Sequence, residues 1–371
     1  MTEPVLWDLD AHTAAKHRVL RAYLGGWIPV MAQQGLRIRA VTSGRPRLLL
    51  VDGFAGPGRY ATGEPGSPLI MLDALLSHTA LKRFGEVTFT LLFIEQDRRR
   101  VDRLRAEVAG LGSLPTNISV HIEEGSFETA FGSLIDAATD SGRTLIPTFA
   151  FIDPFGYSSA SMSLTGRLLD FPRCEALVFL PLTFVHRFVG RAGQEAALTS
   201  LFDCEDWREA ILLQGAARRA FLMDLFECQL GNKANVAYVR SFQLQTQDGN
   251  DYRLVFGLGH RKGLEIAKDA MWKVDPVSGT LYTATTDSGQ EVLFSPNETV
   301  DTAPLLAELR AKFGTAWFTI KQAEECTLID TPFRIGHLRQ RTLQPAEDAG
   351  RLEVRRPRHR GYDGAKMRFT S

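Results

Sequence analysis

Two turns of this sequence carry residues that could bind a cofactor and a substrate. The first spans residues 51–58 and reads Val-Asp-Gly-Phe-Ala-Gly-Pro-Gly, after a short apolar run. The second spans 151–157 and reads Phe-Ile-Asp-Pro-Phe-Gly-Tyr, again after an apolar run. Glycines let a ligand approach the backbone closely, and a carboxylate can accept hydrogen bonds from ligand amino or hydroxyl groups. The two turns therefore predict an enzyme that binds an adenosine-bearing cofactor and a planar substrate.

The choice of cofactor depends on Asp52, on Glu95 and on where the next helix begins. Glu95 ends a second apolar run, where a carboxylate can accept both ribose hydroxyls of an adenosine. The stretch 56–61 also satisfies the loose dinucleotide pattern G-x-G-x-x-A, but that pattern needs a helix to begin inside the loop. Here the helix is expected later, with Ser67 as N-cap and Pro68 at the first position. A late helix favours S-adenosylmethionine, which carries no phosphates, over a nicotinamide dinucleotide.

The glycine-rich loop and the two neighbouring strand ends supply the predicted cofactor contacts. They are Asp52, Gly53, Phe54, Gly56, Gly58, Glu95, Ser126 and Phe127. Asp52 is expected to interact, directly or through water, with the amino group of the methionine portion. Ser126 and Phe127 follow the third apolar run, where the adenine edge would lie, although an ordinary strand-to-helix turn explains them equally well.

The turn after Ile152 supplies the candidate catalytic residues, which are Asp153, Pro154, Phe155 and Tyr157. Proteins that methylate a nitrogen of a base commonly use an Asp/Asn-Pro-Pro-aromatic turn, whose polar groups accept the amino protons while the aromatic ring stacks on the base. Phe155 stands here in place of the second proline. An O-acceptor, another planar substrate, and a purely structural role as a helix N-cap followed by proline therefore stay open.

The first 30 residues are rich in side chains that could contact a substrate or its phosphates. His12 and Lys16 lie one helical turn apart, so both can point the same way, and His17 follows directly. These three residues and Arg59 are predicted to contact substrate or phosphate. The alternative is an amphipathic helix whose Val19, Leu20, Tyr23 and Trp27 pack on the sheet.

The order of apolar runs predicts how these residues are positioned. Five runs, at 47–52, 89–95, 118–122, 147–153 and 176–180, are separated by helix-length segments. Continuous rather than alternating apolar character indicates parallel strands covered on both faces. The runs 236–246 and 252–258, joined through an Asp-Gly turn, indicate an antiparallel hairpin. The pattern predicts an α/β fold with the Rossmann-like sheet of class I methyltransferases over residues 1–275, including an N-terminal helical extension.

The C-terminal residues indicate a separate module over 301–371, after a connecting segment at 276–300. Helices near 304–313, 320–326 and 334–349 and strands near 352–356 and 365–369 predict a winged helix-turn-helix domain. From Thr331 to Ser371 there are ten Arg and Lys residues against four Asp and Glu residues. Such a patch could bind nucleic-acid phosphates, or the module could dock another protein. The predicted phosphate contacts are Arg334, Arg339, Arg356 and Arg358.

Composition limits the remaining possibilities. The 371 residues include 43 basic and 43 acidic ones, so the whole molecule has no general attraction for nucleic acid. The sequence has no apolar stretch of membrane-spanning length and no signal-peptide pattern, which predicts a cytoplasmic protein without membrane contact. The four cysteines, Cys174, Cys204, Cys228 and Cys326, lack metal-ligand spacing, so we expect no metal and interpret them as reduced core thiols.

In combination these motifs resemble the three-Cys-motif partner family, TcmP. The resemblance covers His12-Thr-x-x-Lys-His17, residues 51–60, Gly66-Ser-Pro68, Phe93-Ile-Glu95, Gly125-Ser-Phe-Glu128, Phe151-Ile-Asp-Pro-Phe-Gly156 and Ala270-Met-Trp-Lys273. It implies a C-terminal winged-helix region and a separate three-cysteine partner that looks like a radical-type iron–sulfur (radical SAM-like) protein.

Three functional hypotheses follow. The leading one is a methyltransferase that uses S-adenosylmethionine on nucleic acid or a nucleobase, in DNA modification or repair with the three-cysteine partner. The second is a non-catalytic adaptor that keeps a methyltransferase-like fold and delivers the partner to nucleic acid. The third, a nicotinamide-dependent enzyme, ranks last because no residue clearly supports hydride transfer.

Overall fold

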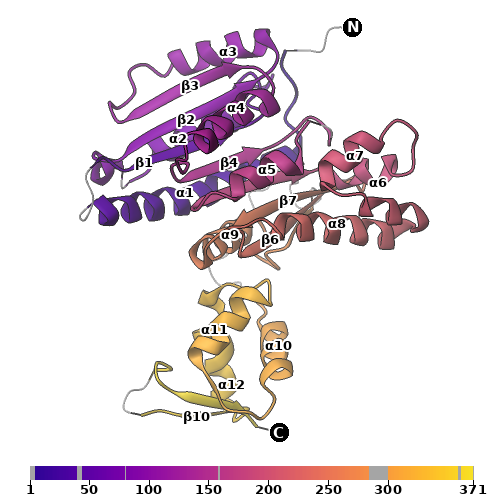
Figure 1. The fold of residues 1–371 in the computed structure, drawn as a ribbon. Helices are drawn as coiled ribbons and strands as arrows, with labels where there is room; N and C mark the ends of the chain where they lie inside the picture. Colours follow the sequence, from indigo (N-terminus) through magenta and orange to yellow (C-terminus); the bar gives the residue numbers. More distant parts are fainter. Residues whose placement is uncertain are drawn as a thin grey trace.

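The computed structural model describes residues 5–39, 44–79, 81–157, 159–283, 300–357 and 361–370. These residues form a large α/β body and a smaller C-terminal module, which lies below the body in Figure 1. Arg358 and most of the predicted connecting segment lie outside the described residues.

The body is built on an eight-stranded sheet with the strand order β3-β2-β1-β4-β5-β7-β6-β8. Its strands are β1 (Arg47–Asp52), β2 (Thr88–Glu95), β3 (Ile118–Glu124), β4 (Thr148–Ile152), β5 (Cys174–Leu180), β6 (Tyr238–Gln245), β7 (Asp251–Leu258) and β8 (Leu281–Thr283). The first five strands run parallel, whereas β7 is antiparallel to both β5 and β6. The five predicted parallel strands and the antiparallel hairpin are confirmed. The short strand β8, which pairs with β6, was not predicted from the sequence.

Helices cover both faces of this sheet, as Figure 1 shows. One face packs against α1 (Ala11–Arg39), α2 (Ser67–Leu76), α3 (Arg98–Ala109) and α9 (Arg261–Val274). The other packs against α4 (Phe127–Asp140), α5 (Met162–Leu169), α6 (Leu182–Phe188), α7 (Glu195–Phe202) and α8 (Gly215–Gly231). Val19, Leu20, Tyr23 and Trp27 of α1 are buried against the sheet, as expected for the helical alternative. Two-sided cover explains why the central strands read as continuous apolar runs.

The helix after the glycine-rich loop begins late, but one residue earlier than predicted. α2 starts at Ser67, and its N-cap is Gly66, so the assignment of Ser67 as N-cap is wrong. Gly66 has an extended backbone, and its N–H donates to the Gly58 carbonyl oxygen at 2.7 Å. That bond links the start of the helix to the end of the glycine-rich loop, so residues 59–65 form a loop whose two ends are hydrogen-bonded to each other.

The cysteines are free thiols with different surroundings. Cys174 and Cys326 are buried, Cys204 is half-buried and Cys228 is exposed, so the expectation of four core thiols is wrong for Cys228. Among the described residues there is no cluster of three or more His, Cys, Asp or Glu side chains that could hold a metal ion. The described helices also include none that is long and apolar enough to cross a membrane.

The C-terminal module has its own core and a three-stranded antiparallel sheet. Its elements are α10 (Ala303–Phe313), β9 (Phe318–Thr319), α11 (Ile320–Ile329), α12 (Gln344–Asp348), β10 (Leu352–Arg355) and β11 (Lys366–Phe369), with the strand order β10-β11-β9. The expected helices and strands are present. The third helical segment is less regular than predicted, because a π-helical turn at Arg339–Leu343 precedes a short α12.

Candidate functional site

Two neighbouring cavities lie at the carboxyl ends of the parallel strands, where parallel α/β sheets bind their ligands. The first, here called the β2–β3 cavity, has a volume of about 570 Å³ and is lined by residues 53–54, 94–97 and 125–128 with Arg100, Phe155 and Ser159. The second, here called the α1 cavity, has a volume of about 490 Å³. It is lined by residues of the N-terminal segment and α1, the loop 54–60, residues 153–156, and the aromatic residues Phe179 of β5, Phe184 of α6 and Tyr252 of β7. Phe54 and Phe155 line both cavities, so the two are adjacent.

The backbone N–H groups at the start of the glycine-rich loop are all used within the protein. The N–H of Gly53 donates to Phe151 O, and that of Ala55 donates to Ile94 O. The N–H groups of Phe54 and Gly56 donate to the carboxylates that end β1 and β2. A pyrophosphate-binding loop needs several such N–H groups free to face the ligand. This loop therefore lacks the donors that a dinucleotide would require at residues 53–56.

Two glycines of the loop are required by their surroundings. A Cβ atom on Gly53 would lie 2.6 Å from the ring of Phe127, which packs under the loop. Gly56 has φ +63°, in the left-handed region that L side chains rarely adopt. The loop conformation thus depends on Gly53 for close packing and on Gly56 for its backbone.

Glu95 is buried at the end of β2 and lines the β2–β3 cavity, as predicted for a ribose-binding carboxylate. Its Oε2 accepts the Gly56 N–H at 2.9 Å, and its Oε1 accepts the Asp97 N–H at 2.8 Å. These bonds fix the carboxylate rigidly. Because each carboxylate oxygen can accept about two hydrogen bonds, Glu95 keeps capacity for two ligand hydroxyls.

The far wall of the β2–β3 cavity is built by the start of α4. Ser126 lines the cavity, and its hydroxyl caps α4 by accepting the Thr129 N–H at 3.1 Å. Phe127 also lines the cavity and packs on Phe54, with ring centroids 5.5 Å apart. The predicted cofactor residues Gly53, Phe54, Glu95, Ser126 and Phe127 are therefore brought together around one cavity.

Two aromatic rings and an arginine pack together between the two cavities. The rings of Trp7 and Phe155 are 4.8 Å apart, and the guanidinium of Arg100 lies 4.0 Å from the Trp7 ring. The Trp7 carbonyl oxygen accepts the Ala61 N–H at 2.8 Å, so the N-terminal segment is tied across the glycine-rich loop. Phe155 is nevertheless 58% exposed, which leaves part of its ring available to a ligand.

Asp153 is paired with a lysine from α1. The Nζ of Lys16 lies 2.5 Å from Asp153 Oδ2, and both side chains are largely buried. The same ammonium lies 4.4 Å from the centre of the Phe179 ring, a favourable cation–π contact. Lys16 and Asp153 both line the α1 cavity, so a predicted catalytic residue and a predicted substrate contact form one charged pair there.

Asp52 is fully buried and lines neither cavity. Burial raises its pKa to about 7, partly offset by the Ser67 hydroxyl and the Phe54 N–H. Its Oδ1 accepts the Phe54 N–H at 3.1 Å, whereas Oδ2 has no hydrogen-bond partner of good geometry within the described part of the chain. A buried polar atom without a partner is uncommon and is typical of a functional position.

One wall of the α1 cavity is aromatic. The His12 ring stacks on Tyr252 at 4.6 Å with the two planes 10° apart, and Tyr252 also stacks on Phe179 at 5.3 Å. Phe184, from α6, completes this wall and is 38% exposed. Burial, together with the Lys16 ammonium, lowers the pKa of His12, which favours its neutral imidazole. The cavity thus offers flat apolar surfaces, a neutral imidazole and a charged pair.

Two predicted contacts lie away from both cavities, and a third is already paired within the protein. Tyr157 lines neither cavity, because its ring packs on Phe188 and its hydroxyl bonds to Gln194. His17 is buried and lines neither cavity. Arg59 lines the α1 cavity, but its guanidinium is bound to Glu107 at 2.7 Å.

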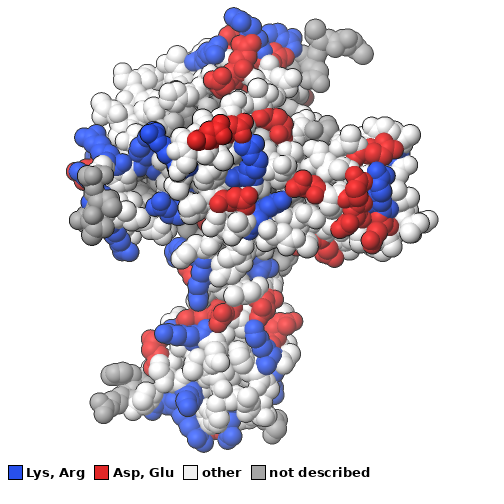
Figure 2. Space-filling view, viewed as in Figure 1, with Lys and Arg blue, Asp and Glu red and all other residues white. Residues whose placement is uncertain are grey.

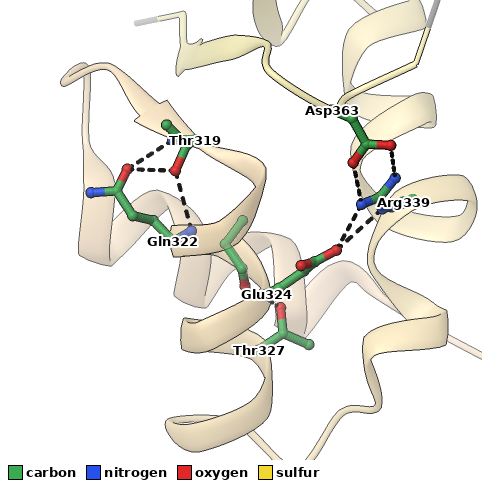
Figure 3. A network of polar contacts seen from close by, with 7 residues as sticks. Thr319, Gln322, Glu324, Thr327, Arg339 and Asp363 are labelled. Atoms are coloured by element: carbon green, nitrogen blue, oxygen red, sulfur yellow. Dashed lines mark hydrogen bonds and ion pairs between the residues drawn. The ribbon is translucent and has the colours of Figure 1, made fainter.

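The described predicted phosphate contacts of the C-terminal module are engaged with acidic side chains of the protein itself. Figure 3 shows Arg339 held between Glu324, at 2.9 Å, and Asp363, at 2.8 Å. Arg356 makes a two-bonded pair with Glu347 at 2.5 and 2.6 Å, and Arg334 lies 3.6 Å from an Asp269 oxygen. Arg339 and Arg356 therefore pair within the module, whereas Arg334 pairs across to α9 of the body. Figure 2 still shows Lys and Arg gathered at the free end of the module.

Several site residues were not predicted from the sequence, notably Phe179, Phe184, Tyr252 and Arg100. Phe179 and Phe184 flank the carboxyl end of β5, next to β4, so their position after a parallel strand could have indicated the site. Tyr252 comes from the antiparallel β7, and only the pairing of β7 with β5 brings it there. Arg100 belongs to α3 and reaches the site by stacking on Trp7.

Comparisons with known proteins identify no family for this chain. No protein-family model matches it, and no curated protein matches it. Solved structures that resemble it include a provisionally named methyltransferase from Porphyromonas gingivalis (13% identity, TM-score 0.27, 62% of this chain and 41% of that chain). They also include the N-methyltransferase NodS from Bradyrhizobium japonicum (13% identity, TM-score 0.24, 62% of this chain and 94% of that chain). This chain thus spans less than half of the Porphyromonas protein. At these TM-scores the function has to be inferred from the chain's own residues.

Proposed function

We propose that this protein is an S-adenosylmethionine-dependent methyltransferase that acts on a nucleobase, free or within nucleic acid. The observation that carries the proposal is the loop at residues 53–56, whose N–H groups all donate inward, beside Glu95 in the β2–β3 cavity. A ribose-binding carboxylate beside a loop with no free N–H group at residues 53–56 suits an adenosine cofactor without phosphates. It argues equally against the nicotinamide alternative.

The residues of the β2–β3 cavity fit the proposed cofactor. Glu95 would accept the ribose hydroxyls, and Phe127 and Ser126 would lie along the adenine. The loop at 53–58, whose residues 55–58 line the adjacent α1 cavity, would hold the methionine portion where the two cavities meet. When bound, S-adenosylmethionine supplies an electrophilic methyl group. Asp52, with one oxygen unpartnered in the described structure, would accept a hydrogen bond from the methionine amino group, directly or through water.

The α1 cavity would hold the acceptor. The Asp153 carboxylate, oriented by Lys16, accepts a hydrogen bond from an amino group of the base, and Phe155 stacks on its ring. The acceptor nitrogen must lose one proton when it gains a methyl group. A ring nitrogen of His12, neutral because burial lowers its pKa, can take that proton. The aromatic wall of Phe179, Phe184 and Tyr252 favours a planar acceptor.

The C-terminal module supports the nucleic-acid part of the proposal. We propose that its three helical segments and three-stranded antiparallel sheet form a winged helix-turn-helix domain. Between Thr331 and Ser371 the sequence has ten Arg and Lys residues and four Asp and Glu residues. This excess of positive charge suits contact with phosphates.

Two further parts of the proposal rest on the sequence resemblance to the three-Cys-motif partner family. One is a three-cysteine, radical SAM-like partner protein, which we expect to co-elute with this protein when the two are co-expressed; separate elution would count against it. The other is the adaptor alternative, in which the fold serves binding only. It is favoured by the Lys16–Asp153 ion pair, because Lys16 already uses part of the hydrogen-bonding capacity of the carboxylate that would bind a substrate.

A transfer assay with radiolabelled S-adenosylmethionine separates catalysis from the adaptor alternative. Single-stranded DNA, double-stranded DNA and transfer RNA are the acceptors to test. We expect labelling by the wild-type protein and at least a ~100-fold loss in Asp153→Ala, with cofactor affinity within about twofold. Asp140→Ala, at the exposed end of α4, is the matched control and should label normally. Undiminished labelling by Asp153→Ala would contradict the assigned role, and retained cofactor binding without labelling of any acceptor would favour the adaptor.

A further inference from the structure

A third cavity lies at the opposite edge of the sheet, where β1, β4 and β5 begin. This cavity, here called the arginine cavity, has a volume of about 250 Å³ and includes Arg39, Arg45, Arg47 and Arg173 in its lining. Its described lining contains no Asp or Glu. In Figure 2, Lys and Arg gather at the left end of the body, around the place where α1 ends in Figure 1. None of the functional residues discussed above lies there.

Strand order brings two of these arginines together. Arg47 opens β1, Arg173 directly precedes β5, and β4 lies between the two strands. Adjacent strands are about 4.8 Å apart, so the backbones of Arg47 and Arg173 are about 10 Å apart, with the start of β4 between them. The Thr148 N–H donates to Arg173 O at 3.3 Å, which anchors the loop that carries Arg173 to the sheet.

The C-terminal end of α1 also lies beside the arginine cavity. A Cβ atom on Gly35 would lie 2.7 Å from the Cβ of Pro46, so the helix passes very near the segment that carries Arg45 and Arg47. The missing side chain at Gly35 permits this approach. The last turn of α1, which contains Arg39, therefore forms one wall of the arginine cavity.

Only one of the four arginines has its charge matched within the described structure. Arg39 lies 2.6 Å from Glu86 and also sits at the C-terminus of α1, where a cation is favourable. Arg45, Arg47 and Arg173 make no side-chain hydrogen bond or ion pair with any described residue. Cations that line one cavity without a described counter-charge give it a positive potential, which a bound anion would offset.

We propose that the arginine cavity binds a phosphate group, either of a free pyrophosphate-bearing molecule or of a nucleic-acid backbone. Guanidinium groups recognise phosphate through paired hydrogen bonds, and several of them around one small cavity favour a multiply charged anion. The apolar part of the lining, from Met31, Leu145 and Ile146, leaves room for a small organic body beside the charge. This binding does not depend on the proposed methyltransferase activity, because the two sites are at opposite ends of the strands.

Calorimetric titration of the full chain tests the proposal, with inorganic pyrophosphate, ATP and a single-stranded DNA 12-mer as separate probes. We expect at least one probe to bind, and Arg47→Gln and Arg173→Gln each to weaken its binding by about tenfold. The triple variant Arg45→Gln/Arg47→Gln/Arg173→Gln should lose binding. Circular dichroism and thermal unfolding establish that each variant is folded. Binding should also weaken as salt concentration rises.

The matched control is Arg37→Gln, which removes an exposed arginine from the same end of α1 but does not line the cavity. It should leave affinity within about twofold of the wild type. Binding of pyrophosphate or ATP identifies a free ligand as the source of the phosphate, and binding of the DNA alone identifies a nucleic-acid backbone. Absence of binding by all three probes, or an equal loss in Arg37→Gln, would overturn the proposal.

Discussion

The burial of Asp52 is expected to make the stability of the protein depend on pH. Its pKa is raised from 3.8 to about 7 in the folded protein, mainly by desolvation. Between these values the folded state retains a proton that the unfolded state releases, so the free energy of unfolding falls as pH rises from about 4 to about 7. In Asp52→Asn we expect the difference in unfolding free energy between pH 5 and pH 8 to shrink by about 2–3 kcal/mol.

Urea denaturation at the two pH values measures this difference. Glu175 has a pKa that burial likewise raises to about 7, but it is present in both proteins and cancels from the comparison. An unchanged difference in Asp52→Asn would mean that Asp52 is ionised in the folded protein at pH 5, against its buried, partly unpartnered position.

The positions of some site residues could be predicted from the sequence, whereas their tertiary contacts could not. Asp52, Glu95 and Asp153 were predicted because each directly follows or ends an apolar strand, and parallel strands bring their carboxyl ends to one edge. The ion pair of Lys16 with Asp153 joins residues 137 positions apart and depends on how α1 packs across the sheet. The stacking of His12 on Tyr252 depends on the same packing, so neither contact follows from local pattern.

The conformation of the glycine-rich loop depends on close packing of Gly53 against the Phe127 ring. In Gly53→Ala the new methyl group would lie 2.6 Å from the Phe127 ring, so the loop or the ring must move. We expect a loss of about 1–3 kcal/mol in unfolding free energy from this overpacking. Gly125→Ala, whose new Cβ would have its nearest neighbour at 3.9 Å, is the matched control. Urea denaturation of both variants checks the prediction, and equal stabilities would show that the loop accommodates the methyl group.

Helices and strands were predicted well where the pattern of apolar residues determines the type of secondary structure. The strands of the parallel sheet and the hairpin follow from apolar runs and an Asp-Gly turn. The N-cap of α2 was assigned one residue late, because Gly66 caps the helix through its backbone conformation and not through a side chain. The π-helical turn at Arg339–Leu343 has no local sequence signal that separates it from an ordinary helix.

At the scale of the whole molecule, one lysine joins the body to the C-terminal module. Lys268 of α9 is buried, and its Nζ donates to the carbonyl oxygens of Thr327, Thr331 and Phe333 at 2.9, 2.6 and 2.9 Å. Burial lowers its pKa to about 6, whereas the three carbonyl oxygens favour the ammonium, because only that form supplies three N–H donors. The Trp272 Nε1–H adds a bond to Pro332 O at 2.9 Å.

Removing this lysine should loosen the junction. Lys268→Met keeps the apolar stem but leaves three carbonyl groups without their donor, at about 1–3 kcal/mol for each group that stays buried. We expect faster amide hydrogen exchange at residues 327–333 and a larger radius of gyration in solution scattering. Lys273→Met, exposed on the same helix, should change neither. Unaltered exchange in Lys268→Met would show that the remaining contacts, such as the Trp272–Pro332 bond and apolar packing, hold the module without the lysine.

The charge distribution of the whole molecule was only partly predictable. The sequence shows the basic excess of the C-terminal module but not which arginines are free, because pairing is decided by tertiary contacts. Arg339 meets Glu324 from α11 and Asp363 from the segment before β11, and neither neighbour is close in sequence. The arginine cavity went unrecognised for the same reason, since its members come from three separate segments.

The central claim is that Glu95 holds the ribose of S-adenosylmethionine, and calorimetric titration with this molecule tests it most directly. We expect a single site in the wild type and at least a ~10-fold loss of affinity in Glu95→Gln. Glu124→Gln is the matched control, because Glu124 pairs in register with Glu95 at the end of β3 but does not line the β2–β3 cavity. It should bind as the wild type does. No binding by the wild type, or equal affinities in Glu95→Gln and the wild type, would contradict the account.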